Sequence, residues 1–346
     1  MAGTAAGVLD RAFVVAVSKR SRGAEETLDH DARLARLAAI AARYPADALD
    51  DPRVFFRPLR PTNATPTWRF VRAGVWETAW PSGYEPFLEE VAAKWSSRIE
   101  NRTARARLYS PLGPAPSTRP AVILVHGYMG GSWLFEENAW PIAWLVRRGL
   151  DVVLPVLPLH AGRAGNHRGA PGFPSSDPRL TNEGFGQAIA DLRTLVADRR
   201  AHGAPHVGVV GMSLGGYTTA LLATVAEPGE VDFVMPMIPL ASIADFARDQ
   251  GRLGDGAAAE LQHAALDRAH RVVSPFARPS RISSARSLVV GAENDRITPI
   301  AHARRLAAHL GSELITMPGG HLLQLGRADA FRALAQRLEN EGILGS

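Results

Sequence analysis

The sequence predicts an α/β protein with a mostly parallel central sheet and helices on both of its faces. Short apolar runs rich in β-branched residues, such as 121–125, are typical of strands that are covered on both sides. Helical stretches follow most of these runs, and such alternation produces a parallel sheet. The third observation is the turn Gly211-Met212-Ser213-Leu214-Gly215, which joins one of these strands to one of these helices.

The composition is that of a globular protein with one large domain or two modest ones. Of the 346 residues, 46% are hydrophobic and 21% are charged. Basic residues exceed acidic residues by 39 to 34, but they are scattered along the chain, so we expect no nucleic-acid partner. There is no run of eighteen apolar residues, and we therefore expect no integral membrane segment.

The chain contains no cysteine, which excludes disulfides, thiolate metal sites and a cysteine nucleophile. Its first residues do not resemble a secretory signal, because the basic residues follow the short apolar stretch 12–17 instead of preceding it. We therefore expect a cytoplasmic protein.

Residues 1–66 are expected to form an N-terminal helical and proline-rich extension, and residues 67–346 the main domain. Apolar residues recur at helical spacing between Glu26 and Arg43, which predicts an amphipathic helix closed by Pro45. The proline-rich stretch that follows is expected to wrap over the surface of another part of the protein.

The main domain begins with strands and then alternates between strands and helices. The alternating pattern of residues 103–109 predicts an edge strand. The other strands are predicted at 69–71, 75–80, 121–125, 150–155, 206–211, 231–237, 287–291 and 313–317. Helices are predicted at 87–97, 139–148, 183–200, 214–223, 243–271, 301–310 and 329–341.

Two of these helices carry further expectations. Thr181 or Asn182 is expected to cap the helix 183–200. The segment 243–271 is longer than a crossover between two strands needs, which predicts a cap-like helical insertion within residues 240–280. A helix packed directly on the sheet is the alternative.

The turn at Ser213 matches G-x-S-x-G, the strand-to-helix elbow that exposes a serine at the end of a strand. A serine in this turn has a strained backbone, and side chains two residues before or after it would collide with the neighbouring strand and helix. Gly211 and Gly215 meet this requirement. The turn predicts a nucleophilic serine, with a tight structural turn as the alternative.

Three further motifs follow predicted strands, namely His126-Gly127-Tyr128-Met129-Gly130-Gly131, Gly291-Ala292-Glu293-Asn294-Asp295-Arg296-Ile297-Thr298-Pro299 and Pro318-Gly319-Gly320-His321. Together with the elbow, they give the chain order serine, acid, histidine. Over roughly residues 100–340 the chain therefore resembles the α/β-hydrolase superfamily, in particular its serine esterases and lipase-like members, with an added N-terminal extension.

The resemblance implies a catalytic triad in an ester-cleaving enzyme that needs no cofactor and no metal. A serine hydroxyl is a weak nucleophile without a base, and His321 is the candidate base for Ser213. Asp295 would hold the far ring nitrogen of His321. The backbone N–H groups of Tyr128 and Leu214 would form the oxyanion hole.

Several roles have alternatives. Glu293 lies close to Asp295 and is the second choice for the acid, and Asp245 is the third. His321 is an ordinary loop histidine in the alternative interpretation. In the resembling family the histidine at position 126 supports the oxyanion loop. Tyr128 is expected to line the acyl pocket, with donation from its hydroxyl as the alternative.

The loop after residue 155 carries two histidines and two arginines, at positions His160, Arg163, His167 and Arg168. Such a group can bind an anion or a metal ion. No carboxylate lies beside it in the sequence, so ordinary loop hydrogen bonds are the favoured interpretation.

The predicted function is therefore a serine hydrolase that cleaves a small-molecule carboxylic ester through an acyl-enzyme. A thioesterase, acyltransferase or peptidase would use the same triad, because the acyl pocket and acceptor site decide the substrate. A non-catalytic binding protein with the same fold is the alternative from another class. The sequence does not fix the oligomeric state.

Overall fold

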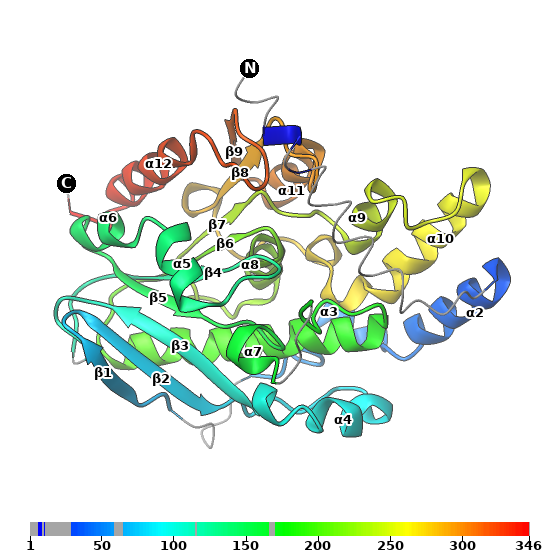
Figure 1. Cartoon of the computed structure of the whole chain (residues 1–346), viewed down its shortest axis with the longest axis horizontal. Helices are drawn as coiled ribbons and strands as arrows, with labels where there is room; N and C mark the ends of the chain where they lie inside the picture. Colours follow the sequence, from blue (N-terminus) through cyan, green and yellow to red (C-terminus); the bar gives the residue numbers. More distant parts are fainter. Residues whose placement is uncertain are drawn as a thin grey trace.

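A computed structural model describes residues 6–8, 10, 29–58, 65–114, 116–165 and 170–345. Their strands form one sheet of nine in the order β1-β2-β3-β5-β4-β6-β7-β8-β9 (Figure 1). The strands are β1 (Trp68–Arg72), β2 (Val75–Pro81), β3 (Thr103–Tyr109), β4 (Ala121–Val125), β5 (Asp151–Pro155), β6 (Val207–Met212), β7 (Phe233–Met237), β8 (Leu288–Ala292) and β9 (Glu313–Met317).

The sheet is parallel from β5 to β9 and antiparallel at its other end. Strands β1, β2 and β3 pair antiparallel with one another, and β3 pairs antiparallel with β5. The expectation that residues 103–109 form an edge strand is therefore wrong, because β3 lies between β2 and β5. Its alternating sequence has another cause: the side chain of Arg107 forms ion pairs with Glu77 and Glu137 at the surface of the sheet.

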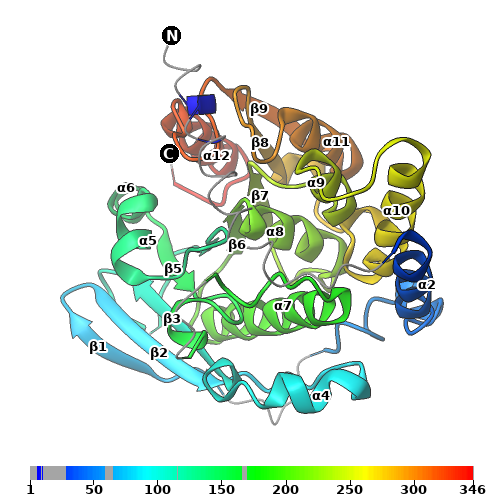
Figure 2. The same cartoon turned by 45° about the vertical axis from the view of Figure 1, so that its right-hand side comes forward.

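Helices cover both faces of the sheet, as the sequence predicts (Figures 1 and 2). One core contains side chains of α7 (Pro178–Ala201), α8 (Leu214–Val225) and α11 (Ile300–Leu310). The core on the opposite face contains side chains of α6 (Ile142–Arg147) and α12 (Arg327–Asn340), together with Trp140 after α5 (Trp133–Ala139). Neighbouring residues of β4 alternate between the two cores, as a strand buried on both sides requires.

Two helix predictions need correction. The helix expected at 139–148 begins only at Ile142, as α6, because residue 139 ends the separate helix α5 and the chain is extended at Trp140. Helix α7 begins at Pro178 instead of residue 183, and its cap is Asp177 instead of Thr181 or Asn182. The Asp177 side chain accepts a hydrogen bond from the Arg179 N–H at 3.0 Å, and proline suits the first helical position.

The segment after β7 contains two helices, α9 (Ile243–Asp249) and α10 (Gly256–Ala269), and its role as a cap stays a prediction. Helix α2 (His30–Ala41) of the N-terminal region packs beside α10 in both views (Figures 1 and 2). Leu37 and Ile40 of α2 share a small apolar core with Ala244, Leu266 and other residues of α9 and α10. The N-terminal region thus contributes one helix to the layer formed by α2, α9 and α10.

The chain that follows α2 is anchored, over residues 48–56, in the core that contains side chains of α7 and α8. It contains the short helix α3 (Asp47–Asp50), and the Phe55 and Phe56 side chains after it are buried. Helix α4 (Glu89–Ser96) precedes β3. No helix within the described residues is long and apolar enough to cross a membrane.

Candidate active site

Ser213 lies on the sharp turn between β6 and α8, with φ 58° and ψ −114°. This backbone conformation costs a non-glycine residue on the order of 1–3 kcal/mol, so the surroundings must enforce it. The Ser213 N–H donates to the carbonyl of Met237 on β7 at 2.9 Å, which fixes the turn to the neighbouring strand.

The two glycines of the elbow are required by the space around them. A Cβ atom on Gly211 would lie 2.1 Å from the Gly215 carbonyl oxygen, and one on Gly215 would lie 2.1 Å from the Val125 carbonyl oxygen. Both distances are far below a van der Waals contact. A side chain at either position would therefore collide with the neighbouring backbone, as the motif predicts.

His321 lies between Ser213 and Asp295. Its Nε2 is 2.9 Å from the Ser213 Oγ, and its Nδ1 is 2.8 Å from the Asp295 Oδ2. Because Nδ1 faces a carboxylate, it carries the ring proton, and Nε2 is left as the acceptor for the serine hydroxyl. The three residues follow β6, β8 and β9, whose carboxyl ends meet at one edge of the parallel sheet.

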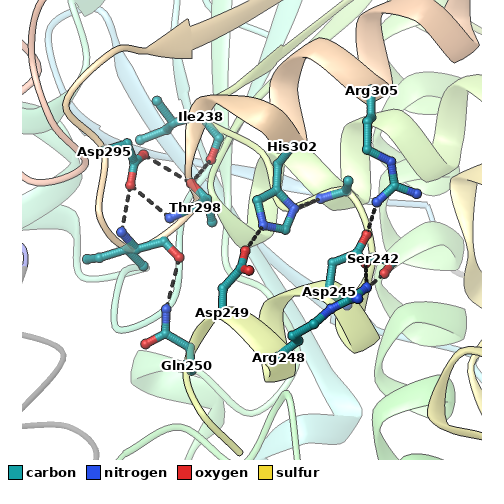
Figure 3. Close-up of polar contacts among 12 residues, drawn as sticks. Ile238, Ser242, Asp245, Arg248, Asp249, Gln250, Asp295, Thr298, His302 and Arg305 are labelled. Atoms are coloured by element: carbon teal, nitrogen blue, oxygen red, sulfur yellow. Dashed lines mark hydrogen bonds and ion pairs between the residues drawn. The ribbon is translucent and has the colours of Figure 1, made fainter. Parts of the chain in front are cut away.

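Asp295 is held firmly by its own loop and is only 2% exposed. Its Oδ1 accepts hydrogen bonds from the Ile297 and Thr298 N–H groups, both at 2.8 Å. The Thr298 hydroxyl lies 3.0 Å from Asp295 Oδ2 and 3.1 Å from His321 Nδ1 (Figure 3 shows its contacts with Asp295 and Ile238). Sequence analysis did not identify Thr298, although a threonine three residues after an aspartate is typical of a loop closed on its own carboxylate.

The two alternative acids lie elsewhere. Glu293 has an exposed side chain, and its backbone N–H pairs with the Met317 carbonyl. Asp245 lies on α9, apart from Asp295 (Figure 3). Burial opposes the ionisation of Asp245, but its hydrogen bond with His263 and the charge of Arg305 outweigh burial and lower its pKa to about 2. The geometry therefore favours Asp295.

The loop after β4 is braced by two buried side chains. His126 Nε2 accepts a hydrogen bond from the Leu157 N–H at 3.0 Å, so its Nδ1–H donates to the Gly127 carbonyl at 2.8 Å. Burial lowers the pKa of His126. Glu136 accepts hydrogen bonds from the Gly131 N–H and the Trp140 ring N–H, both at 2.8 Å. This arrangement agrees with a supporting role for His126, and sequence analysis did not identify Glu136.

Of the two expected oxyanion donors, Leu214 directly follows the serine in the chain, and Tyr128 follows a glycine that lies beside the serine. Leu214 is the first residue of α8, where a backbone N–H has no partner within the helix. A Cβ atom on Gly127 would lie 3.3 Å from the Ser213 Cβ, so the backbone that leads to Tyr128 passes directly beside the serine. The Tyr128 ring meets the His160 ring edge-on, with the centroids 6.1 Å apart. Donation by these N–H groups remains a prediction.

The arginine and histidine loop after β5 makes ordinary structural contacts where the structure describes it. Arg163 forms a buried ion pair with Asp191 of α7 at 2.8 Å, and the His160 Nδ1–H donates to the Pro158 carbonyl at 2.8 Å. Burial lowers the pKa of His160 well below its usual value. His167 and Arg168 lie outside the described residues. The described part of the chain holds no cluster of three or more side chains arranged to bind a metal.

The chain belongs to the alpha/beta hydrolase family, whose sequence pattern residues 122–334 match. The uncharacterized protein Rv2627c of Mycobacterium tuberculosis (strain ATCC 25618 / H37Rv) is 29% identical over 269 residues, which cover 76% of this chain. A protein of strain CDC 1551 / Oshkosh matches equally. The chain spans 63% of the length of these relatives.

Solved structures with the same fold include two esterases. Acetyl xylan esterase 1 from Thermoanaerobacterium sp. JW/SL YS485 is 17% identical with a TM-score of 0.52, and acetyl xylan esterase from Paenibacillus sp. R4 is 14% identical with a TM-score of 0.53. Each match covers 85% of this chain and 99% of the esterase. At these identities the similarity establishes the α/β-hydrolase fold.

Proposed function

We propose that this protein is a serine hydrolase that cleaves carboxylic esters of small molecules. The observation that carries the proposal is the continuous hydrogen-bonded series from Asp295 through His321 to Ser213, at 2.8 and 2.9 Å. A base within hydrogen-bond reach of a serine, itself oriented by a buried carboxylate, is the arrangement that activates a hydroxyl for nucleophilic attack.

The reaction follows from these contacts. The Ser213 Oγ attacks the ester carbonyl carbon while His321 Nε2 accepts its proton. The backbone N–H groups of Tyr128 and Leu214 bind the oxygen that becomes negative in the tetrahedral intermediate. The intermediate expels the alcohol, which takes the proton from His321. Water then attacks the acyl-enzyme by the same proton path and releases the carboxylic acid.

The fold comparison supports an ester as the bond that is cleaved. Two proteins that share this fold along most of the chain are named acetyl xylan esterases. A parallel sheet with its reactive groups beyond the strand ends hosts many chemistries, so the substrate class rests on the site and on this likeness together.

The test is labelling of the purified protein with a fluorophosphonate probe, beside hydrolysis of p-nitrophenyl acetate. We expect Ser213→Ala to abolish labelling and His321→Ala to lower the labelling rate by at least about 10³-fold. Ser97→Ala, which changes an exposed serine, is the matched control and should react as the wild type does. Full hydrolysis by a contaminant-free Ser213→Ala preparation would contradict the proposal.

A further inference from the structure

Asp10, in the N-terminal region, has its carboxylate buried against the two loops that carry His321 and Asp295. The residue is 0% exposed. Its Oδ2 accepts hydrogen bonds from the His321 N–H at 2.8 Å and the Arg296 N–H at 3.2 Å. Its Oδ1 accepts one from the Leu322 N–H at 3.0 Å. One carboxylate thus binds three backbone donors from two loops.

The short helical segment 6–8, which precedes Asp10 in the chain, lies near β8 and β9 in both views (Figures 1 and 2). A Cβ atom on Gly320 would lie 2.7 Å from the Asp10 Oδ2 and 3.1 Å from the Ala6 Cβ. On the other side, a Cβ atom on Gly7 would lie 3.3 Å from the Asn294 carbonyl oxygen. Glycine therefore permits the close approach on both surfaces.

The other contacts of the histidine loop leave the His321 N–H to Asp10, while the His321 carbonyl accepts a hydrogen bond from the Gln324 side chain at 3.1 Å. The loop is closed on itself by a hydrogen bond from the Gly320 N–H to the Leu323 carbonyl at 2.9 Å. Asn294 joins the base of this loop to the acid loop, through its N–H to Gly319 and its side chain to Pro318. Asp10 adds the connection at His321 itself.

We propose that Asp10 is a positioning residue for His321. By binding His321 and Arg296 through the same oxygen, it fixes the histidine loop relative to the loop that carries Asp295. Hydrogen bonds from N–H groups to a carboxylate are shorter and stronger than those to neutral acceptors. A catalytic base has to be held within about 0.5 Å of its productive position. This inference rests on the proposed function, since it assigns His321 the role of general base.

The first experiment compares Asp10→Ala and Asp10→Asn with the wild type. Alanine removes all three acceptor contacts, whereas asparagine keeps one oxygen that can still join His321 to Arg296. We expect kcat for p-nitrophenyl acetate to fall by about 10- to 100-fold in Asp10→Ala and by less in Asp10→Asn. KM should stay within about twofold, because a fully buried Asp10 does not touch the substrate.

Asp29→Ala is the matched control. Asp29 also accepts a backbone hydrogen bond, from Ala32 at 2.8 Å, but it caps α2 and is exposed. We expect it to keep the wild-type kcat. Thermal unfolding of each variant shows which fraction is folded at the assay temperature. If Asp10→Ala keeps the wild-type kcat, or loses activity only in proportion to its unfolded fraction, the proposal is wrong.

The second experiment does not depend on ester hydrolysis. The proton on His321 Nδ1, in its bond to Asp295, should give a strongly deshielded proton NMR resonance that is absent in His321→Gln. We expect this resonance to broaden or shift in Asp10→Ala and to persist in Asp29→Ala. An inactive wild type would overturn the proposed hydrolase, while the resonance would still decide whether Asp10 positions His321. An unchanged resonance in Asp10→Ala would overturn the positioning role.

Gly320→Ala supplies an independent test of the contact between Asp10 and the histidine loop. Its new methyl group would displace the Asp10 carboxylate, so it should lower kcat in the wild-type background by a factor similar to Asp10→Ala. In the Asp10→Ala background it should lower kcat much less, because the displaced group is gone. Equal effects in both backgrounds would show that Gly320 acts without Asp10 and would contradict the proposal.

Discussion

The Asp295 carboxylate accepts hydrogen bonds from two backbone N–H groups and lies within reach of the Thr298 hydroxyl and the His321 ring. These partners leave it one orientation, with Oδ2 toward the imidazole. Glu293, two residues earlier, has no such constraint, because its side chain is exposed. The choice between the two acids is therefore made by the loop after β8 and not by the charge of either side chain.

We predict that Asp295→Asn lowers kcat by about 10⁴-fold, because an amide at this position favours the wrong ring tautomer of His321. Glu293→Gln is the matched control and should stay within about twofold of the wild type. Steady-state hydrolysis of p-nitrophenyl acetate measures both. A large loss in Glu293→Gln with an active Asp295→Asn would reverse the assignment.

At this scale the sequence predicts residues whose chemistry is carried by a local motif. Ser213, Asp295 and His321 each follow a predicted strand, and the structure brings the three together. Asp10 and Glu136 have no motif of their own. Asp10 meets His321 only through the tertiary fold, and Glu136 reaches its loop from the next helix, so neither contact is visible in the order of residues.

Among the elements, the β6–α8 elbow depends most strictly on its glycines. We predict that Gly215→Ala lowers the free energy of unfolding by at least about 2 kcal/mol, because its Cβ would lie 2.1 Å from the backbone of β4. Gly254→Ala, whose Cβ would have no neighbour within 3.5 Å, is the control and should stay within about 0.5 kcal/mol. Urea unfolding measures both, and equal stabilities would refute the steric argument.

Helix α2 contributes a buried apolar face to the layer that it forms with α9 and α10, so we expect this face to stabilise the two insertion helices. Leu37 is 5% exposed between α2 and the insertion helices. We predict that Leu37→Ala destabilises this layer by about 2–4 kcal/mol and increases hydrogen exchange across α9 and α10. Leu261 of α10 is 55% exposed, so Leu261→Ala should change exchange little. Unchanged exchange in Leu37→Ala would mean that α2 does not stabilise the two insertion helices.

Strands could be predicted more closely than helix ends. Each predicted strand corresponds to one of β1 to β9. For β4, β7 and β8, which are buried along their whole length, the signal is a continuous apolar run. The position of β3 inside the sheet could not be predicted, since alternation of polar and apolar residues indicates that one face of a strand is polar and does not indicate that the strand lies at the edge of the sheet. The start of α7 was missed because Asp177 and Pro178 end a stretch rich in glycine and proline, which hides a capped helix.

Over the whole molecule, several histidines are enclosed so fully that burial outweighs the nearby carboxylates that favour protonation, Glu136 for His126 and Asp177 for His270. Burial lowers the pKa of His126 and, more strongly, that of His160. Burial also lowers the pKa of His270 to about 3, and its Nδ1–H lies 2.7 Å from the Asn182 side-chain oxygen. In the folded protein each therefore takes up a proton only at a lower pH than in the unfolded chain, where its pKa is near 6.5.

The fold should therefore lose stability as the pH falls below 6.5, because the unfolded chain then binds more protons than the folded one. Each such histidine contributes a slope of about 1.4 kcal/mol per pH unit between pH 6.5 and its folded pKa. We predict that His270→Gln makes the fall in unfolding free energy between pH 6.5 and 4.5 shallower by about this slope. Urea unfolding at a series of pH values measures it. Between pH 7.5 and 8.5 the unfolding free energies of the variant and the wild type should change in parallel, since the histidine is neutral in both the folded and the unfolded state. Identical slopes between pH 6.5 and 4.5 would show that His270 is protonated in the folded protein.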